Sequence, residues 1–137
     1  MSDKNNVTAA VYATLGTNDH DRAARFYDAV MATIDWRTHF VFSGGRAYSE
    51  RGAGEGFSLW VLSPFNGEAA TAGNGTMIGL PAASRAAVHA FHEAAMANGG
   101  SDEGGPGPRP HYGPDWYAAY VRDPEGNKLA IVYRGLE

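Results

Sequence analysis

A cluster of side chains able to do chemistry stands in the segment "RPHYGPDWY" at residues 109–117. Arg109 can bind an anion, His111 can carry a proton near neutral pH, and Tyr112 can donate a hydrogen bond. Prolines stiffen this stretch, and loops held on a rigid scaffold are where binding groups concentrate. The cluster therefore has two interpretations. It is either a catalytic pair, His111 and Tyr112, beside a substrate-binding Arg109, or a structural turn whose histidine bonds only to backbone.

Other kinds of chemistry find no support in the composition. The 137 residues include no cysteine, which excludes disulfides, thiolate metal sites and a cysteine nucleophile. The glycine-rich stretches "GNGTMIG" and "GAGEGF" lack the spacing and the following helix of a nucleotide-binding loop. Neither a serine nucleophile elbow nor a close pair of carboxylates is present.

Charge and hydropathy indicate the surroundings of the protein. The net charge of −4, with 11 scattered Lys and Arg residues, argues against nucleic acid or an anionic membrane as a partner. Apolar runs stay well short of the roughly 18 residues that a membrane helix needs, and the N-terminus lacks the layout of a signal peptide. We therefore expect a cytoplasmic protein with no membrane partner.

Hydrophobic periodicity predicts the elements that must position these residues. A strand is expected over Val7–Thr17, with Val11, Ala13 and Leu15 on one face and Tyr12 and Thr14 on the other. The later elements are a helix capped by Asp19, strands within 36–43, 45–52 and 56–65, a flexible joint at 66–75, a strand within 76–83, a helix from Ser84 to Gly99, and strands at 116–123 and 127–134.

The two halves of the chain repeat each other. A shift of 65 positions aligns the first strand and helix with their second-half counterparts, and a shift of 70 aligns the last strands. The matched pairs include Leu15 with Leu80, Asp19 with Ser84, Phe26 with Phe91, Leu59 with Leu129 and Val61 with Ile131. The five extra residues are expected within 101–115. The chain is thus predicted to be an α+β protein made of two βαβββ modules.

The segments "TLGTNDHDRAARFYDAV" and "PHYGPDWYAAYVRDPEGNKLAIVYR" resemble the glyoxalase, bleomycin-resistance and extradiol-dioxygenase superfamily, the vicinal oxygen chelate proteins, and in particular its short lactoylglutathione-lyase-like members. The resemblance implies one domain over 1–137, with a first module at about 7–63, a joint at 64–75 and a second module at about 76–137. It also implies a curved mixed sheet with both helices on its convex face and the site on the concave side.

Enzymes of that superfamily hold a divalent metal on the first and last strand of each module. Those positions fall on Tyr12, Trp60, Met77 and Ala130 here, and the internal repeat pairs the same positions across the two modules. An indole and a methyl group cannot coordinate a metal, a thioether prefers soft ions, and a single phenol is a poor anchor. We therefore expect no metal and no other cofactor.

The inward positions instead predict a largely apolar pocket. The expected substrate-binding residues are Tyr12, Thr14, Trp60, Met77, Arg109 and Ala130. The alternative is that the larger of these side chains simply pack as a second core. His39 could face either this pocket or solvent. His89 and His92 have a spacing that can hold a metal, but the resemblance puts their helix on the convex side.

Two functions fit the sequence. In the first, the protein resembles the bleomycin-resistance branch and binds a small hydrophobic or aromatic molecule in a metal-free pocket, as a homodimer in which modules of two chains meet. In the second, it is a lactoylglutathione-lyase-like enzyme acting on a small carbonyl or thioester substrate, either with His111 or Tyr112 as the proton carrier or with a metal bound at positions other than the four expected ones.

Overall fold

The computed structural model describes residues 11–135, which form two modules of the same βαβββ order. The first module contains β1 (Tyr12–Gly16), α1 (His20–Ala32), β2 (Trp36–Phe42), β3 (Gly45–Glu50) and β4 (Ser58–Leu62). The second contains β5 (Met77–Pro81), α2 (Arg85–Ala97), β6 (Ser101–Pro108), β7 (Trp116–Arg122) and β8 (Lys128–Arg134). The predicted α+β fold is confirmed.

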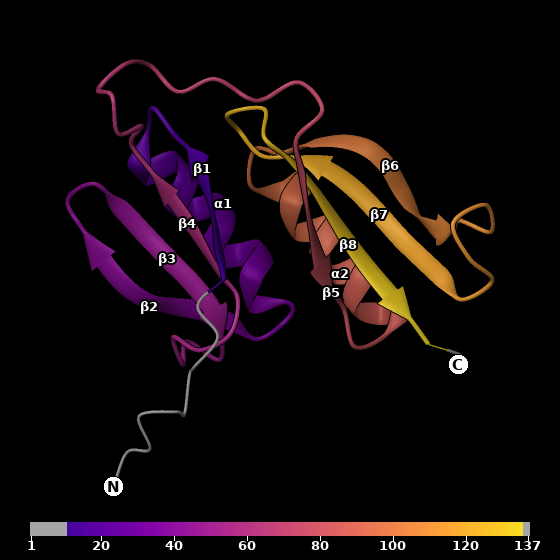
Figure 1. The fold of residues 1–137 in the computed structure, drawn as a ribbon. Coiled ribbons are helices and arrows are strands. Elements are labelled where there is room, and N and C mark those ends of the chain that lie inside the picture. Colours follow the sequence, from indigo (N-terminus) through magenta and orange to yellow (C-terminus); the bar gives the residue numbers. More distant parts are fainter. Residues whose placement is uncertain (1–10, 136–137) are drawn as a thin grey trace, which may run out of the picture.

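Each module has its own four-stranded mixed sheet. The strand order is β1-β4-β3-β2 in the first and β5-β8-β7-β6 in the second, and in both sheets only the pair that contains the first strand is parallel. The sheets lie side by side, with the strands of each drawn in front of its helix in Figure 1. In the described range 11–135, neither helix is long and apolar enough to cross a membrane.

The strand registers reproduce the sequence repeat. Tyr12 lies opposite Ser58 in the first module, and Met77 lies opposite Lys128 in the second. These two pairs are related by the shifts of 65 and 70 positions found in the sequence. The duplication is therefore structural, because equivalent residues occupy equivalent points of the two ladders.

Both helices begin where the sequence predicts. The Asp19 side chain accepts a hydrogen bond from the backbone N–H of Arg22, and the Ser84 hydroxyl accepts one from Ala87. Such caps satisfy backbone donors that the first helical turn leaves unpaired. Gly99 follows the end of α2 with a φ of 94°, a conformation that favours glycine.

Two segments differ from the sequence prediction. The first strand begins at Tyr12, and Val11 before it is exposed, whereas Ala13 and Leu15 face the core as expected; the predicted part at 7–10 lies outside the described residues. The Gly- and Pro-rich stretch 101–108, for which no separate strand was predicted, forms β6. Because β6 is an edge strand with two register shifts, it tolerates residues that a central strand excludes.

One hydrophobic core joins the modules. Phe26 and Val30 of α1 and Val88 and Phe91 of α2 are fully buried in the same cluster as the helix-facing residues of both sheets, such as Leu59. The two helices contact each other. The opposite faces of the sheets are left free of this core, and it is there that the candidate site residues lie.

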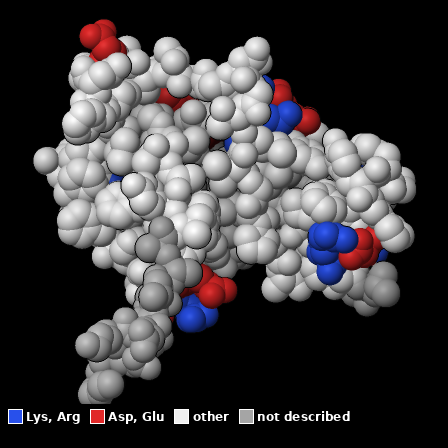
Figure 2. Space-filling model, viewed as in Figure 1, with Lys and Arg blue, Asp and Glu red and all other residues white. Residues whose placement is uncertain are grey.

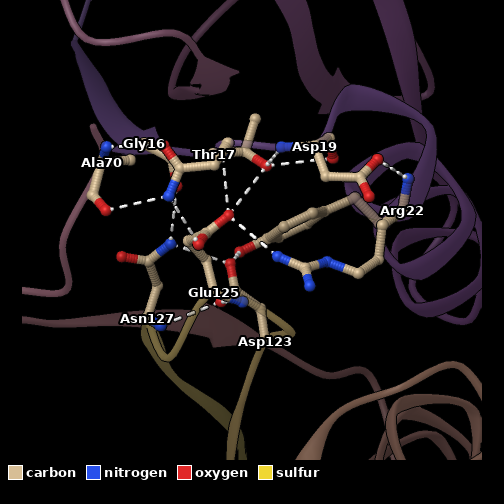
Figure 3. Close-up of polar contacts among 10 residues, drawn as sticks. Gly16, Thr17, Asp19, Arg22, Ala70, Asp123, Glu125 and Asn127 are labelled. Carbon is tan, nitrogen blue, oxygen red and sulfur yellow. Dashed lines mark hydrogen bonds and ion pairs between the residues drawn. The ribbon is translucent and has the colours of Figure 1, made fainter. Parts of the chain in front are cut away.

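A set of polar contacts, here called the clasp, ties the turn between β7 and β8 to the first module (Figure 3). Glu125 accepts hydrogen bonds from the backbone N–H of Asn18 at 2.7 Å and from Asn18 Nδ2 at 2.9 Å, and it pairs with Arg22 at 3.1 Å. Asn127 Nδ2 donates to the Gly16 carbonyl at 3.0 Å. Asn18 also exchanges two hydrogen bonds with the backbone of Ala70, so the joint predicted to be flexible is held at this point.

The clasp predicts a pH dependence of stability. Partial burial alone would raise the pKa of Glu125, but the hydrogen bonds from Asn18 and Thr17 and the charge of Arg22 together lower that pKa below its ordinary value of 4.5. Because the folded pKa is the lower one, this stabilisation is complete above pH 4.5 and is lost as the pH falls through the folded value. We expect Glu125→Gln to flatten the acid limb of a plot of urea midpoint against pH. If the acid limb of Glu125→Gln were as steep as that of the wild type, other carboxylates would be responsible for the pH dependence.

Candidate functional site

The first module carries an open cavity on the sheet face turned away from α1. Side chains alternate between the faces of a strand, so Tyr12, Thr14 and Trp60 lie opposite the core residues Leu15 and Leu59. The cavity has a volume of about 850 Å³. It is lined by Tyr12, Thr14, Gly16, Phe42, Gly44, Trp60, Leu62, Ser63, Pro64, Phe65, Asn66, Ala69, Ala70 and Thr71.

Trp60 is the centre of an aromatic cluster on this face. Its ring centroid lies 6.5 Å from that of Tyr12, 5.9 Å from Phe40, 6.2 Å from Phe42 and 6.0 Å from the His39 ring. The indole N–H donates to the Ser58 hydroxyl at 3.0 Å on the same strand, so the ring needs no further partner. Tyr12 is 66% exposed, so the cluster offers open ring surface. The indole N–H of Trp60 already has its hydrogen-bond partner.

The joint between the modules forms one wall of this cavity. Its residues 63–71 follow β4 and pass over the end of β1, where Ala70 is buried and fixed by Asn18. Phe65 stands on this wall and is fully exposed. The joint is therefore part of the site and not only a connection, a role that its Gly- and Ala-rich composition does not indicate.

The second module carries two adjoining cavities on the corresponding face. The polar one, of about 470 Å³, is lined by Met77, Glu103, Gly104, Arg109, His111, Tyr112, Trp116, Tyr120 and Lys128. The apolar one, of about 620 Å³, is lined by Met77, Gly79, Leu80, Pro81, Ala82, Trp116, Tyr120, Ala130, Val132 and Arg134. Met77, Trp116 and Tyr120 belong to both, so the two cavities form one groove with a polar and an apolar end.

The predicted catalytic pair lies at the polar end of this groove. The rings of His111 and Tyr112 are 4.1 Å apart between centroids, and Tyr112 lies 5.8 Å from Trp116. Both residues are exposed on the segment that links β6 to β7. Arg109 donates three hydrogen bonds to backbone carbonyls in this region, so the segment is organised around its guanidinium.

The eight predicted site residues all line a cavity, but they do not share one. Tyr12, Thr14 and Trp60 line the cavity of the first module, and the other five line the groove of the second. The alternative of a second packed core does not fit Tyr12 or Met77, which are 66% and 46% exposed, whereas Trp60 is half-buried among the rings around it. Ala130, by contrast, is 2% exposed and contributes to the floor of the groove.

The donor set at the four expected metal positions does not fit a divalent cation. A phenol and an indole stand in one cavity, while a thioether and a methyl group stand in the groove of the other module. Within residues 11–135, no three His, Asp or Glu side chains are grouped so that they could hold a metal ion. These positions therefore present mostly apolar side-chain surface to the two cavities.

His39, His89 and His92 each share a hydrogen bond with one polar side chain. His39 lies beside Trp60 and shares a hydrogen bond of 2.9 Å with Ser49, which places it on the cavity side of β2. His89 is 2.7 Å from the Tyr117 hydroxyl, and His92 is 2.8 Å from Asp102. These contacts place the two histidines of α2 in structural hydrogen bonds away from the cavities.

Charge is sparse on the face that carries the cavities. Figure 2 shows a surface made mostly of uncharged residues, with acidic and basic side chains in a few separate groups. Among the described residues that line the cavity of the first module, none carries a charge. The groove of the second module, in contrast, is lined by four charged residues, Glu103, Arg109, Lys128 and Arg134.

Sequence reasoning did not identify several of the lining residues. Phe42 pairs with Gly45 in the sheet, and it meets Trp60 only through a ring contact across β3, which its place in the sequence does not reveal. Phe65 could not be identified either, because it lies in a segment without regular structure. The alternation of residues along β7 and β8 predicts which face of the sheet Tyr120 and Lys128 occupy. Their grouping with Glu103, however, depends on how β6 pairs with β7.

Comparisons with known proteins were made for sequence and for structure. No protein-family model matches the chain, and no curated protein matches it. Among solved structures, a glyoxalase-related enzyme from Fulvimarina pelagi has 23% sequence identity, a TM-score of 0.71, and coverage of 93% of this chain and 88% of its own. A lactoylglutathione lyase from Agrobacterium tumefaciens has 18% identity, a TM-score of 0.62, and coverage of 91% and 92%. These two likenesses show the fold.

A third solved structure is more similar in sequence. The glyoxalase/bleomycin resistance protein from Albidiferax ferrireducens T118 has a TM-score of 0.80 and 34% identity, and the match covers 92% of this chain and 98% of that one. The sequence identity extends over nearly the whole of both chains, so it covers both βαβββ modules. This chain therefore belongs to the glyoxalase/bleomycin resistance protein family, within the vicinal oxygen chelate superfamily.

Proposed function

We propose that this protein binds a small hydrophobic or aromatic molecule in the cavity of its first module, without a metal ion. The observation that carries the proposal is the cluster of rings around Trp60, exposed in a cavity that no charged side chain of the described chain lines. Sites of this kind are mostly apolar, with a few polar groups to orient the ligand. Here Thr14, Ser63 and Asn66 are the polar groups available.

Ring stacking supplies the physical reason for an aromatic ligand. An aromatic pair contributes about 0.5–1.5 kcal/mol beyond the burial of its area. Trp60 and Tyr12 present ring surface that the chain itself leaves open, and Phe42 and Phe65 stand on the walls around it. A flat ligand could therefore contact several rings at once.

Replacing Trp60 tests this proposal. With the neutral compound 2-naphthamide as probe, we expect Trp60→Leu to weaken binding about tenfold or more, because one lost ring contact and its area are worth roughly 1.4 kcal/mol or more. Isothermal titration calorimetry measures the affinity directly. Trp36→Phe is the matched control, because Trp36 is a buried tryptophan of the same module that lines neither this cavity nor the groove of the second module. Equal affinity of the wild type and Trp60→Leu would remove the cavity of the first module as the site.

We also propose that the protein forms a homodimer in which a second copy covers these open faces. The large apolar side chains exposed in one chain include Tyr12, Phe40 and Phe42 of the first module and Met77 and Tyr112 of the second. Exposed apolar patches of this kind commonly mark an interface. A second copy that set its second module against the first module of its partner would bury both groups. Analytical ultracentrifugation at micromolar concentration tests this arrangement, and a monomer there would contradict it.

The second candidate is a lactoylglutathione-lyase-like enzyme. It is favoured by the position of His111 and Tyr112, which line the polar cavity together with Arg109. Such an enzyme would turn over a hemithioacetal, with His111 moving the proton. Assays with added Ni²⁺ or Zn²⁺ test this reading. Turnover that His111→Ala abolishes would support the enzyme, and no turnover under any condition would leave the binding function.

A further inference from the structure

The polar cavity of the second module holds a positive charge that no carboxylate balances. The Arg109 guanidinium donates to the carbonyl oxygens of Gly105, Gly107 and Pro108, at 2.7, 2.9 and 3.3 Å, and it lies 5.5 Å from the centroid of the Tyr120 ring. Carbonyl oxygens fix its position but leave its charge in place. Among residues 11–135, no Asp or Glu lies within ion-pair distance of Arg109.

The acid in this cavity is already shared between two cations. Glu103 Oε1 lies 3.3 Å from Arg122 Nε and 3.8 Å from Lys128 Nζ. Lys128 also stands over the Tyr120 ring, 5.9 Å from its centroid. The cavity is thus lined by two cations, Arg109 and Lys128, and by one carboxylate that also pairs with Arg122, in a protein whose net charge is −4. This local excess of positive charge favours an anion from solution.

An unpaired donor stands in the wall between the polar and apolar cavities. The indole Nε1 of Trp116 is buried and has no hydrogen-bond partner within the described part of the chain. A buried donor without an acceptor is destabilising, and native proteins rarely leave one unpaired. Trp116 lines both cavities, so the residue that carries this unpaired donor is one that a ligand in the groove would contact.

The apolar cavity continues the groove beyond Trp116. Its walls come from Gly79, Leu80, Pro81, Ala130 and Val132, which present only aliphatic surface and backbone. With about 620 Å³ beside the 470 Å³ of the polar cavity, the groove has room for a fused-ring body and a charged group. The polar end of the groove therefore suits a charged group, and the apolar end suits the hydrophobic body of the same ligand.

We propose that this groove is a binding site for an organic anion with a flat apolar body. The carboxylate or sulfonate of the ligand lies between Arg109 and Lys128, and its apolar part occupies the cavity floored by Ala130. Charge-assisted hydrogen bonds are about twice as strong as neutral ones, which makes the acid group the main determinant of affinity. The site lies within one chain, so it needs neither a second copy nor a ligand on Trp60.

A pair of probes that differ only in charge tests this inference. The affinities of 2-naphthoate and 2-naphthamide are measured by isothermal titration calorimetry at low salt. We expect the wild type to prefer naphthoate by about tenfold. In Lys128→Met, which keeps an unbranched side chain but removes the charge, we expect that preference to fall by severalfold. Arg37→Met is the matched control, because Arg37 is an exposed cation of the first module paired with Asp35.

Three results would overturn the inference. They are equal affinity of the wild type for the two probes, no binding of naphthoate, or an unchanged preference in both Lys128→Met and Arg109→Gln. Lys128→Met keeps the test valid if Arg109→Gln disturbs the segment that Arg109 organises. Naphthamide is measured in the same proteins and reports on aromatic binding in the first module. A failure of that proposed function therefore appears separately from a loss of the preference for the anion.

Discussion

Asp123→Ala is expected to lower the free energy of unfolding by about 3–5 kcal/mol. The carboxylate is 5% exposed and accepts four hydrogen bonds. They come from the Tyr27 hydroxyl at 2.6 Å, from Asn127 Nδ2 at 2.9 Å, and from the backbone N–H groups of Glu125 and Asn127, both at 2.9 Å. Alanine would leave all four donors without an acceptor and would release the turn from the first module.

The Tyr27 hydroxyl is a dependable donor in this arrangement. Burial, with the adjacent charge of Asp123 as a further cause, raises the pKa of Tyr27 well above its ordinary value of 10.0. The phenol therefore stays protonated throughout the neutral range and keeps its hydrogen bond. The same Asp123 oxygen also accepts the hydrogen bond from Asn127 Nδ2, so the two donors meet on one atom.

Tyr27→Phe separates the contribution of this one hydrogen bond from that of the whole carboxylate. It removes the hydroxyl and leaves Asp123 with three donors, so we expect a loss of about 1–2 kcal/mol. Urea unfolding followed by circular dichroism measures both variants on the same scale. If Asp123→Ala proved no more destabilising than Tyr27→Phe, the turn would not depend on the buried carboxylate.

The second large effect is expected from Phe91→Ala, which should cost about 3–5 kcal/mol of stability. Phe91 is fully buried in the core, at the position that the repeat pairs with Phe26. Truncation removes the ring from contact with both helices and leaves a cavity that the surrounding side chains can fill only in part. Because a domain of this size has about 5–15 kcal/mol in total, such a loss is a large fraction of its stability.

Phe65→Ala is the matched control, since the chemical change is the same and only the burial differs. Phe65 is 107% exposed, so its truncation is expected to change stability by no more than about 0.5 kcal/mol. If Phe91→Ala left the protein too unstable to measure, Phe91→Leu would replace it. Its loss of stability is expected to be smaller than that of Phe91→Ala but still larger than that of Phe65→Ala. Equal stability losses at the two phenylalanines would contradict the placement of the core.

The fold could be predicted from the sequence because the helix caps, the strand patterns and the internal repeat all indicate the same two modules. Asp19 and Ser84 cap their helices as expected, and the shifts that align the halves also relate the ladder pairs Tyr12–Ser58 and Met77–Lys128. Such a prediction succeeds because caps and strand alternation are local properties that duplication repeats. It failed at β6, where glycines and prolines conceal an edge strand that exists only because β7 is available to pair with it.

The candidate site was predicted less completely than the fold. Tyr12, Thr14 and Trp60 share one cavity because they alternate on paired strands, which the sequence alone can indicate. The wall made by Phe65 and Ala70 could not be predicted, because it depends on Asn18 holding the joint against the first module. The charges of Glu103 on β6, Arg109 directly after β6 and Lys128 at the start of β8 meet only after the sheet has formed.

The sequence by itself determined that two equivalent modules would each place an apolar stripe against a helix and leave a second, mostly uncharged face. Together with the family resemblance, it also indicated that the four expected metal positions carry Tyr, Trp, Met and Ala, side chains that do not fit a divalent cation. The tertiary structure alone decided that these positions divide between two separate hollows, one aromatic and one cationic. The physical reason is that strand alternation fixes which face a side chain occupies, whereas its neighbours across the sheet are fixed by long-range packing.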